Sequence, residues 1–161
     1  GLGRDDILIT QLPNSAEYPA RYLAALRLGI ILSPVPMQYR RHELEEIVAL
    51  TGARATLTVR TMKGVEHAAG AVQLGSALPL QVLCLGSDAP AGTTPFTPAP
   101  LDDAARAALQ AHVASLAISA DDIATIRVEL GHAGADIQPA FPVWFRREHL
   151  VDAFPMSAAR L

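Results

Sequence analysis

The chain has 161 residues, of which 50% are hydrophobic and 18% are charged, and its net charge at pH 7 is −3. A chain of this length forms one domain or part of a larger one, and its apolar content excludes disorder throughout. The slight negative charge excludes the basic surface that nucleic-acid binding requires, so we expect no nucleic acid as a partner.

The first elements are predicted from hydrophobic periodicity and from the residues that interrupt it. Residues 7–11 form a short β-rich run that Pro13 ends. Ser15 is a typical N-cap residue, and apolar side chains then recur at helical spacing until Gly29 ends the helix. The longest apolar run, residues 28–35, is far shorter than the ~20 residues that cross a bilayer. No transmembrane segment or secretory leader is predicted, and we expect a cytoplasmic location.

The same alternation continues to residue 85. Further elements are a strand at 30–35, a helix at 41–50 that Gly52 closes, a strand at 55–59, a helix at 65–74 and a strand at 80–85. A β-α-β-α-β-α-β order predicts a mainly parallel sheet flanked by helices. The predicted fold class is therefore α/β.

The second half of the chain is less regular. Residues 87–100 hold four of the twelve prolines, which is typical of a linker or mobile loop. An alanine-rich helix at 102–114 and a strand at 123–130 follow. From Gly131 the pattern becomes irregular, and residues 146–154 are predicted to form one last short helix.

Three motifs carry a resemblance to a known family. They are Leu12-Pro13-Asn14-Ser15 with Glu17, then Tyr39 with Glu43-Leu44, then Asp121-Asp122-Ile123-Ala124-Thr125-Ile126. In this order and spacing the chain resembles the amino-terminal part of the AMP-forming acyl-CoA synthetases, which are adenylate-forming ligases. The resemblance covers residues 1–126 and implies an incomplete layered domain, like the amino-terminal subdomain of these enzymes. Residues 127–161 are then a divergent tail.

The resemblance also implies a chemistry. In the family, a carboxylate attacks the α-phosphate of ATP, and the acyl-adenylate is passed on to coenzyme A as a thioester. ATP, Mg and CoA are therefore implied for the full-length family. The acyl pocket of the family lies beyond the matched stretch, so the acid substrate is not specified here.

The family's phosphate-binding loop is missing at its expected place. It should follow Ile126 as a Ser/Thr/Gly-rich loop that ends in Pro-Lys-Gly, because backbone amides, hydroxyls and a lysine hold the triphosphate. Residues 127–136 contain no hydroxyl, and Glu129 and Asp136 would repel phosphates. Arg127 precedes the loop and is predicted to lie on the strand. Lys63 is the only lysine in the chain, so the family's loop lysine and its carboxy-terminal catalytic lysine are both absent.

No other residue is assigned to a catalytic, cofactor or metal site. Ala91-Gly92-Thr93-Thr94-Pro95 and Lys63-Gly64-Val65 imitate parts of the loop, but neither has the rest of it nearby. Paired aspartates precede predicted elements and are typical of turns and caps, and Arg40-Arg41 and Arg146-Arg147 are typical of a solvated surface. Cys84 lies in an apolar segment and is interpreted as a buried, inert thiol. The histidines, none at a recognised metal-ligand spacing, are His42, His67, His112, His132 and His149.

The aromatic residues are concentrated near the end of the chain. Four of the eight, Phe141, Trp144, Phe145 and Phe154, lie in the last 21 residues. They predict either local packing on the sheet or an apolar surface that a partner covers. We expect the partner to be a second copy or the missing remainder of a ligase domain.

The preferred interpretation is a fragment or truncated relative of an acid–CoA ligase that is inactive by itself. Two alternatives are a non-enzymatic interaction module on the same scaffold and a small nucleotide-binding α/β domain. A further hypothesis is a shifted reading frame after Ile126, because residues 130–134 can be encoded so that the shifted frame gives Ser-Gly-Thr-Pro-Gly. Resequencing the coding DNA for residues 120–150 would test this hypothesis.

Overall fold

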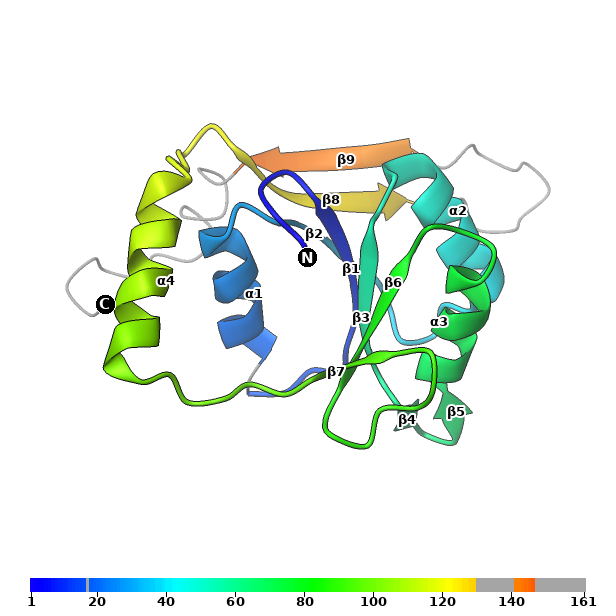
Figure 1. The fold of residues 1–161 in the computed structure, drawn as a ribbon. Coiled ribbons are helices and arrows are strands. Elements are labelled where there is room, and N and C mark those ends of the chain that lie inside the picture. The colour runs from blue at the N-terminus through cyan, green and yellow to red at the C-terminus, as the bar shows by residue number, and fades with distance from the viewer. Residues whose placement is uncertain (17, 130–140, 147–161) are drawn as a thin grey trace.

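The computed structural model describes residues 1–16, 18–129 and 141–146 (Figure 1). Its elements are β1 (Ile7–Gln11), α1 (Tyr18–Arg27), β2 (Ile31–Pro34), α2 (Arg41–Thr51), β3 (Ala55–Val59), β4 (Thr61–Met62), β5 (Val65–Glu66), α3 (His67–Gly75), β6 (Gln81–Leu85), β7 (Thr94–Phe96), α4 (Asp103–Ser115), β8 (Ile123–Glu129) and β9 (Phe141–Arg146). Among the described helices, none combines the length and the apolar character that spanning a membrane requires.

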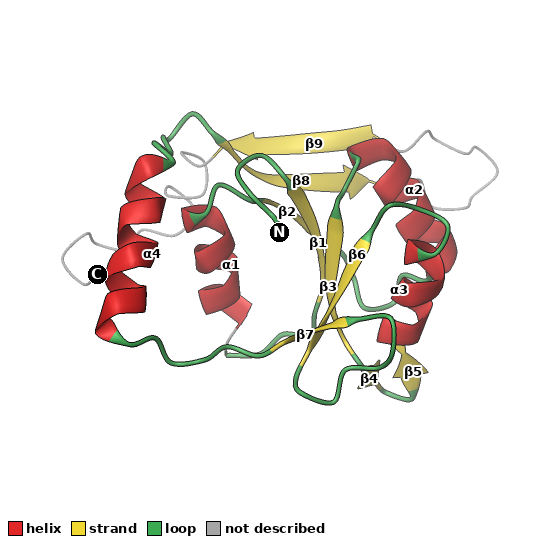
Figure 2. Ribbon diagram, viewed as in Figure 1, coloured by secondary structure: helices red, strands yellow, loops and turns green. Residues whose placement is uncertain are grey.

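Seven strands form one sheet in the order β7-β6-β3-β1-β2-β8-β9, and β4 and β5 form a separate small hairpin. All neighbours in the large sheet are parallel except β9, which is antiparallel to β8. Helices α1 and α4 lie on one side of the sheet and α2 and α3 on the other (Figure 2). The mainly parallel α/β architecture that the alternation predicts is thus confirmed.

The sheet grows in both directions from β1. The chain leaves β1 through α1 and returns as β2 on one side, then passes through α2 and returns as β3 on the other side of β1. Successive crossovers that leave a strand in opposite directions create a topological switch point. In this sheet the switch point lies between β1 and β3.

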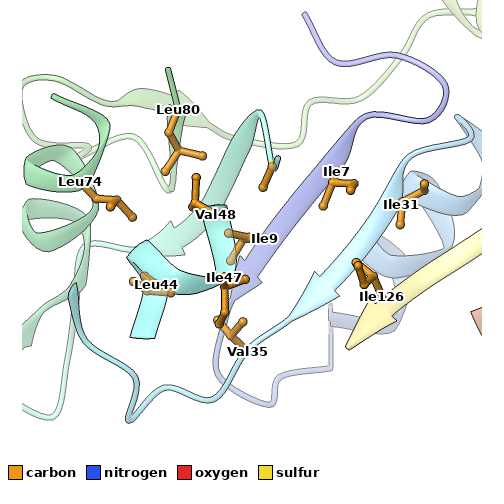
Figure 3. Close-up of a cluster of buried hydrophobic side chains, with 11 residues drawn as sticks. Ile7, Ile9, Ile31, Val35, Leu44, Ile47, Val48, Leu74, Leu80 and Ile126 are labelled. Carbon is orange, nitrogen blue, oxygen red and sulfur yellow. The ribbon is translucent and has the colours of Figure 1, made fainter. Parts of the chain in front are cut away.

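Alternating side chains of the strands build a core on each face of the sheet. Ile9 points to the α2 and α3 side and is fully buried against Ile47 and Leu74 (Figure 3). Leu8, the preceding residue, packs with Leu32 on the α1 side. Burial of these two rows holds the helices on the sheet, and it places the carboxyl ends of β1, β2 and β3 at one edge.

The predicted elements on the α2 side are largely confirmed. In α2 the buried residues are Leu44, Ile47 and Val48, which is the predicted stripe. Gly52 ends the helix with φ of 66°, a left-handed conformation that glycine adopts without strain.

Two predicted helix starts are wrong. Helix α1 begins at Tyr18, so Ser15 lies ahead of the helix, where its carbonyl accepts a hydrogen bond from the Tyr18 amide at 3.1 Å. Residues 65–66 form β5 instead of opening α3, because Lys63 and Gly64 adopt φ of 49° and 77° and turn the chain back on β4. Lys63 is therefore at the tip of a hairpin and not at the start of a helix.

The region predicted as a linker contains a strand that its proline content did not indicate. Within residues 87–100, β7 pairs in parallel with β6, and all three of its residues are exposed. Pro95 fits there because an edge strand tolerates a missing amide hydrogen. The mobility of the remaining linker stays a prediction that amide hydrogen exchange can measure.

The strand predicted at 123–130 is confirmed, and the divergent tail expected after residue 126 contains a second strand that was not predicted. Strand β8 continues to Glu129 and β9 returns beside it, so that Phe141, Trp144 and Phe145 lie on a strand. Arg146 ends this strand and does not open the helix predicted at 146–154. The other predictions for this region concern residues 130–134, His132, Asp136, residues 147–154, His149 and Phe154, which lie outside the described residues.

Candidate functional site

A cleft of about 810 Å³ opens at the carboxyl ends of the central strands. Its lining comes from four segments: the residues that follow β1, the β2–α2 loop at 35–40, the β4–β5 turn and the start of α3. Tyr18 of α1 closes one side, and its hydroxyl lies 3.4 Å from the hydroxyl of Thr10. The cleft therefore lies beside the switch point between β1 and β3, where open parallel sheets generally bind ligands.

The cleft is lined by three basic side chains: Arg40 from the β2–α2 loop, Lys63 from the β4–β5 turn and His67 from the start of α3. Among the described lining residues there is no carboxylate. Arg40 and Lys63 are exposed, whereas His67 is buried. This distribution of charge attracts anions.

The pKa of His67 is shifted by its surroundings in the cleft. Burial lowers the pKa of the His67 imidazole below 6.5, and the positive charge of Arg40 lowers it further. The neutral form of His67 therefore predominates at pH 7.

A buried amide connects the walls of the cleft. The Gln11 side chain, 2% exposed, donates from Nε2 to the backbone carbonyls of Pro36 at 3.1 Å and Tyr39 at 2.9 Å. Its Oε1 lies 3.4 Å from Nδ1 of His67. Arg40 follows Tyr39 directly, and its guanidinium donates to the carbonyls of Met37 and Tyr39 at 2.7 and 2.9 Å.

Sequence reasoning missed this site. It interpreted Arg40 as part of a solvated pair, Lys63 as an exposed helix start and His67 as an ordinary histidine. The interpretation as a solvated surface residue is correct for Arg41, which is exposed and pairs with Glu45 at 2.6 Å. A usable signal was that all three basic residues follow closely after predicted parallel strands, whose carboxyl ends share one edge.

Several predicted roles are confirmed. Cys84 is fully buried, and burial together with the charge of Asp88 raises the pKa of its thiol, as an inert thiol requires. Asp102 caps α4 by accepting from the Ala105 amide at 2.7 Å. Asp122 accepts from the Ser119 amide at 2.7 Å in the turn before β8.

The expected phosphate loop is only partly within the described residues. Arg127 lies on β8, as predicted. Because β8 is parallel to β2, its carboxyl end points to the same edge as the cleft. Across the described part of the chain, no group of three or more histidine, cysteine, aspartate or glutamate side chains could hold a metal ion.

The fold is a mainly parallel α/β domain with a cleft at the edge where the central strands end. Residues 1–127 match the sequence profile of the AMP-binding enzymes, and the chain belongs to this family. The chain is 29% identical over 140 residues to a 2-hydroxy-7-methoxy-5-methyl-1-naphthoate–CoA ligase of Streptomyces carzinostaticus, a match that covers 83% of this chain and 25% of the relative.

Solved structures show the same fold. Apo MatB from Rhodopseudomonas palustris aligns with a TM-score of 0.62 and 19% identity, over 95% of this chain and 27% of that chain. The N-terminal subdomain of NpsA from Klebsiella oxytoca, in complex with 3-hydroxybenzoyl-AMSN, aligns with a TM-score of 0.56 and 17% identity, over 93% of this chain and 30% of that chain. The chain thus spans about a quarter of the length of its curated relative.

Proposed function

We propose that this chain is the amino-terminal part of an ATP-dependent acid–CoA ligase, and that it does not catalyse the reaction by itself. The observation that carries the proposal is the family match over residues 1–127, combined with a basic cleft at the sheet edge where this fold binds ligands. ATP, Mg and CoA are the substrates and cofactor of the complete ligase in this proposal.

The proposed reaction has two steps. A carboxylate oxygen attacks the α-phosphorus of ATP and pyrophosphate leaves, which gives the acyl-adenylate. The thiol sulfur of CoA then attacks the acyl carbon and AMP leaves. ATP and CoA carry several negative charges each, so a ligase needs basic groups at two places.

The cleft supports a role in holding CoA. In the family the triphosphate loop follows β8, which is separated from β1 by β2. The cleft lies at the ends of β1 and β2 and is lined by the β4–β5 turn, which follows β3. It therefore extends from β2 toward β3, away from the end of β8 where that loop is expected. Arg40 and Lys63 are exposed and would meet the phosphates of the second polyanionic substrate, and His67 would gain a partner when an anion enters.

Catalytic inactivity follows from the missing loop. Stabilising a triphosphate in its transition state takes converging amides, hydroxyls and a cation. Residues 127–136, where the loop is expected, supply neither a hydroxyl nor a lysine. Without these donors, ATP gains no anchor at the end of β8.

Thermal melts of the chain with each substrate test both parts of the proposal. A ligand at ~100 times its dissociation constant stabilises a protein by about 2.7 kcal/mol. Millimolar CoA should raise the melting temperature, and Arg40→Gln with Lys63→Gln should abolish the shift. Arg41→Gln is the matched control, because Arg41 is the next residue but pairs with Glu45. Millimolar ATP with magnesium should give no shift, since residues 127–136 lack the hydroxyls and the lysine that would anchor its triphosphate.

Two results would contradict the proposal. Pyrophosphate release by the chain in the presence of carboxylic acids would refute its inactivity. The absence of any shift with CoA would refute the role of the cleft.

One observation favours a second role as an interaction module. Helix α4 has no buried residue, and Leu101 and Leu109 at this helix are 45% and 42% exposed. A 13-residue helix is marginal in water unless it packs on a partner. The rest of a ligase or a second copy of the chain would supply that contact.

A further inference from the structure

We infer that Gln11 is the positioning residue of the cleft: its buried amide holds the loop that carries Arg40 against His67 and fixes which ring nitrogen of His67 carries the proton. The inference rests on the proposed function, because it assigns a purpose to the cleft that binds an anion.

The position of Gln11 in the sheet suits this role. Gln11 is the last residue of β1, the strand between β2 and β3, and it lies beside Thr58 of β3. From this central place its side chain contacts Pro36, Tyr39 and His67, which lie 25, 28 and 56 positions away in the sequence. No other side chain described in the structure makes hydrogen bonds to two walls of the cleft.

The two donated hydrogen bonds fix the β2–α2 loop from inside. Both hydrogens of the Gln11 amide are used, one for Pro36 and one for Tyr39. The backbone N–H of Arg40, the residue after Tyr39, donates to the Glu43 carboxylate at 2.8 Å. The loop contains a single turn, closed by the Tyr39 amide donating to the Pro36 carbonyl at 3.2 Å, and the bonds from Gln11 fix this turn, and with it the Arg40 backbone, against β1.

The orientation of the amide then decides the tautomer of His67. Because the two carbonyls accept from Nε2 of Gln11, the group that faces His67 is the oxygen Oε1. An oxygen accepts, so Nδ1 of neutral His67 must donate. Its Nε2 is then the nitrogen without a proton, and it takes up the proton when the ring becomes charged.

This arrangement links anion binding to proton uptake. Arg40 and Lys63 are the charged groups among the described lining residues of the cleft, and the charge of Arg40 disfavours protonation of His67. An anion between them removes that penalty, so His67 gains a proton at Nε2 as the anion binds. Gln11 accepts the hydrogen bond from Nδ1 of His67, so Nε2 is the ring nitrogen that gains or loses the proton.

The test uses the full chain and CoA as the probe. Gln11→Leu keeps the approximate volume of the side chain and removes both donors and the acceptor. We expect a fall of about tenfold in CoA affinity, since one to two hydrogen bonds that order the loop are lost. Thr58→Val is the matched control, because Thr58 is the buried neighbour of Gln11 and its hydroxyl has no hydrogen-bond partner among the described residues. Thr58→Val should bind CoA as the wild type does.

Nuclear magnetic resonance of the His67 ring gives a readout that needs no ligand. The wild type should show one neutral tautomer with the proton on Nδ1, and Gln11→Leu should show a mixture. Gln11→Glu, which keeps the length of the side chain, should raise the pH at which His67 titrates because a carboxylate replaces a neutral oxygen.

The outcomes separate the inference from the function on which it rests. Wild-type CoA affinity in Gln11→Leu, or an unchanged tautomer and titration of His67 in the Gln11 variants, would overturn the positioning role. A wild type that binds no CoA but shows the predicted His67 tautomer would refute the proposed function and leave the role of Gln11 in place. If Gln11→Leu does not fold, Gln11→Glu carries the same test through the His67 titration.

Discussion

Gly29 lies so close to Arg4 that a Cβ atom on Gly29 would stand 2.9 Å from Cγ of Arg4. Gly29 also has φ of 73°, the left-handed region that side chains disfavour. The turn between α1 and β2 thus packs directly on the loop before β1. Arg4 extends this contact to the turn before β8, since its guanidinium pairs with Asp122 at 2.8 Å.

The first prediction concerns this turn. Gly29→Ala should lower the free energy of unfolding by about 1–3 kcal/mol, because it adds both backbone strain and a clash. Gly70→Ala is the control: Gly70 lies within α3 and a Cβ there meets nothing within 4 Å. It should stabilise by about 0.5–1 kcal/mol, as alanine does within helices. Urea denaturation measures both, and equal effects of the two variants would contradict the prediction.

The second prediction compares two apolar residues of α2. Ile47 is fully buried, whereas Leu50 on the same helix is 44% exposed. Ile47→Ala should cost about 2–5 kcal/mol because it removes buried contacts and leaves a cavity. Leu50→Ala should cost less than about 1 kcal/mol. A small effect of Ile47→Ala in urea denaturation would mean that α2 does not pack on β1 as described.

The third prediction concerns pH. The pKa of His67 is lowered by burial and by Arg40, so below pH 6.5 the unfolded chain binds a proton that the folded chain does not. Stability should therefore be complete above pH 6.5 and should fall as the pH drops below that value. His67→Gln should remove this part of the dependence, which denaturation at pH 7.5 and 5.5 can measure. His42→Gln, a change at an exposed histidine, should leave it in place.

The fourth prediction is that the chain self-associates at micromolar concentration. Phe96 on the edge strand β7 and Leu109 on α4 are exposed apolar side chains, and an edge strand offers unpaired backbone groups. Sedimentation should show association that Leu109→Glu weakens. Leu50→Glu changes an exposed leucine of α2, on the other side of the sheet, and should have a smaller effect. A wild type that stays monomeric over a wide concentration range would refute this prediction.

The sequence by itself determined the local elements and the family. Hydrophobic periodicity is a property of neighbouring residues, so the stripe of α2 and its end at Gly52 could be predicted without the rest of the fold. The three motifs around Asn14, Glu43 and Asp121 were together sufficient for the family, because they occur in the family's order and spacing.

Only the tertiary structure decided where the sheet ends and where its cleft lies. Strands β7 and β9 form through hydrogen bonds to β6 and β8, which are non-local partners that no periodicity reports. Arg40, Lys63 and His67 line one cleft because the crossovers around β1 run in opposite directions and bring the β2–α2 loop, the β4–β5 turn and the start of α3 to one edge. Gln11 was visible as part of a motif, but its role depends on two carbonyls and an imidazole that only the folded chain places around it.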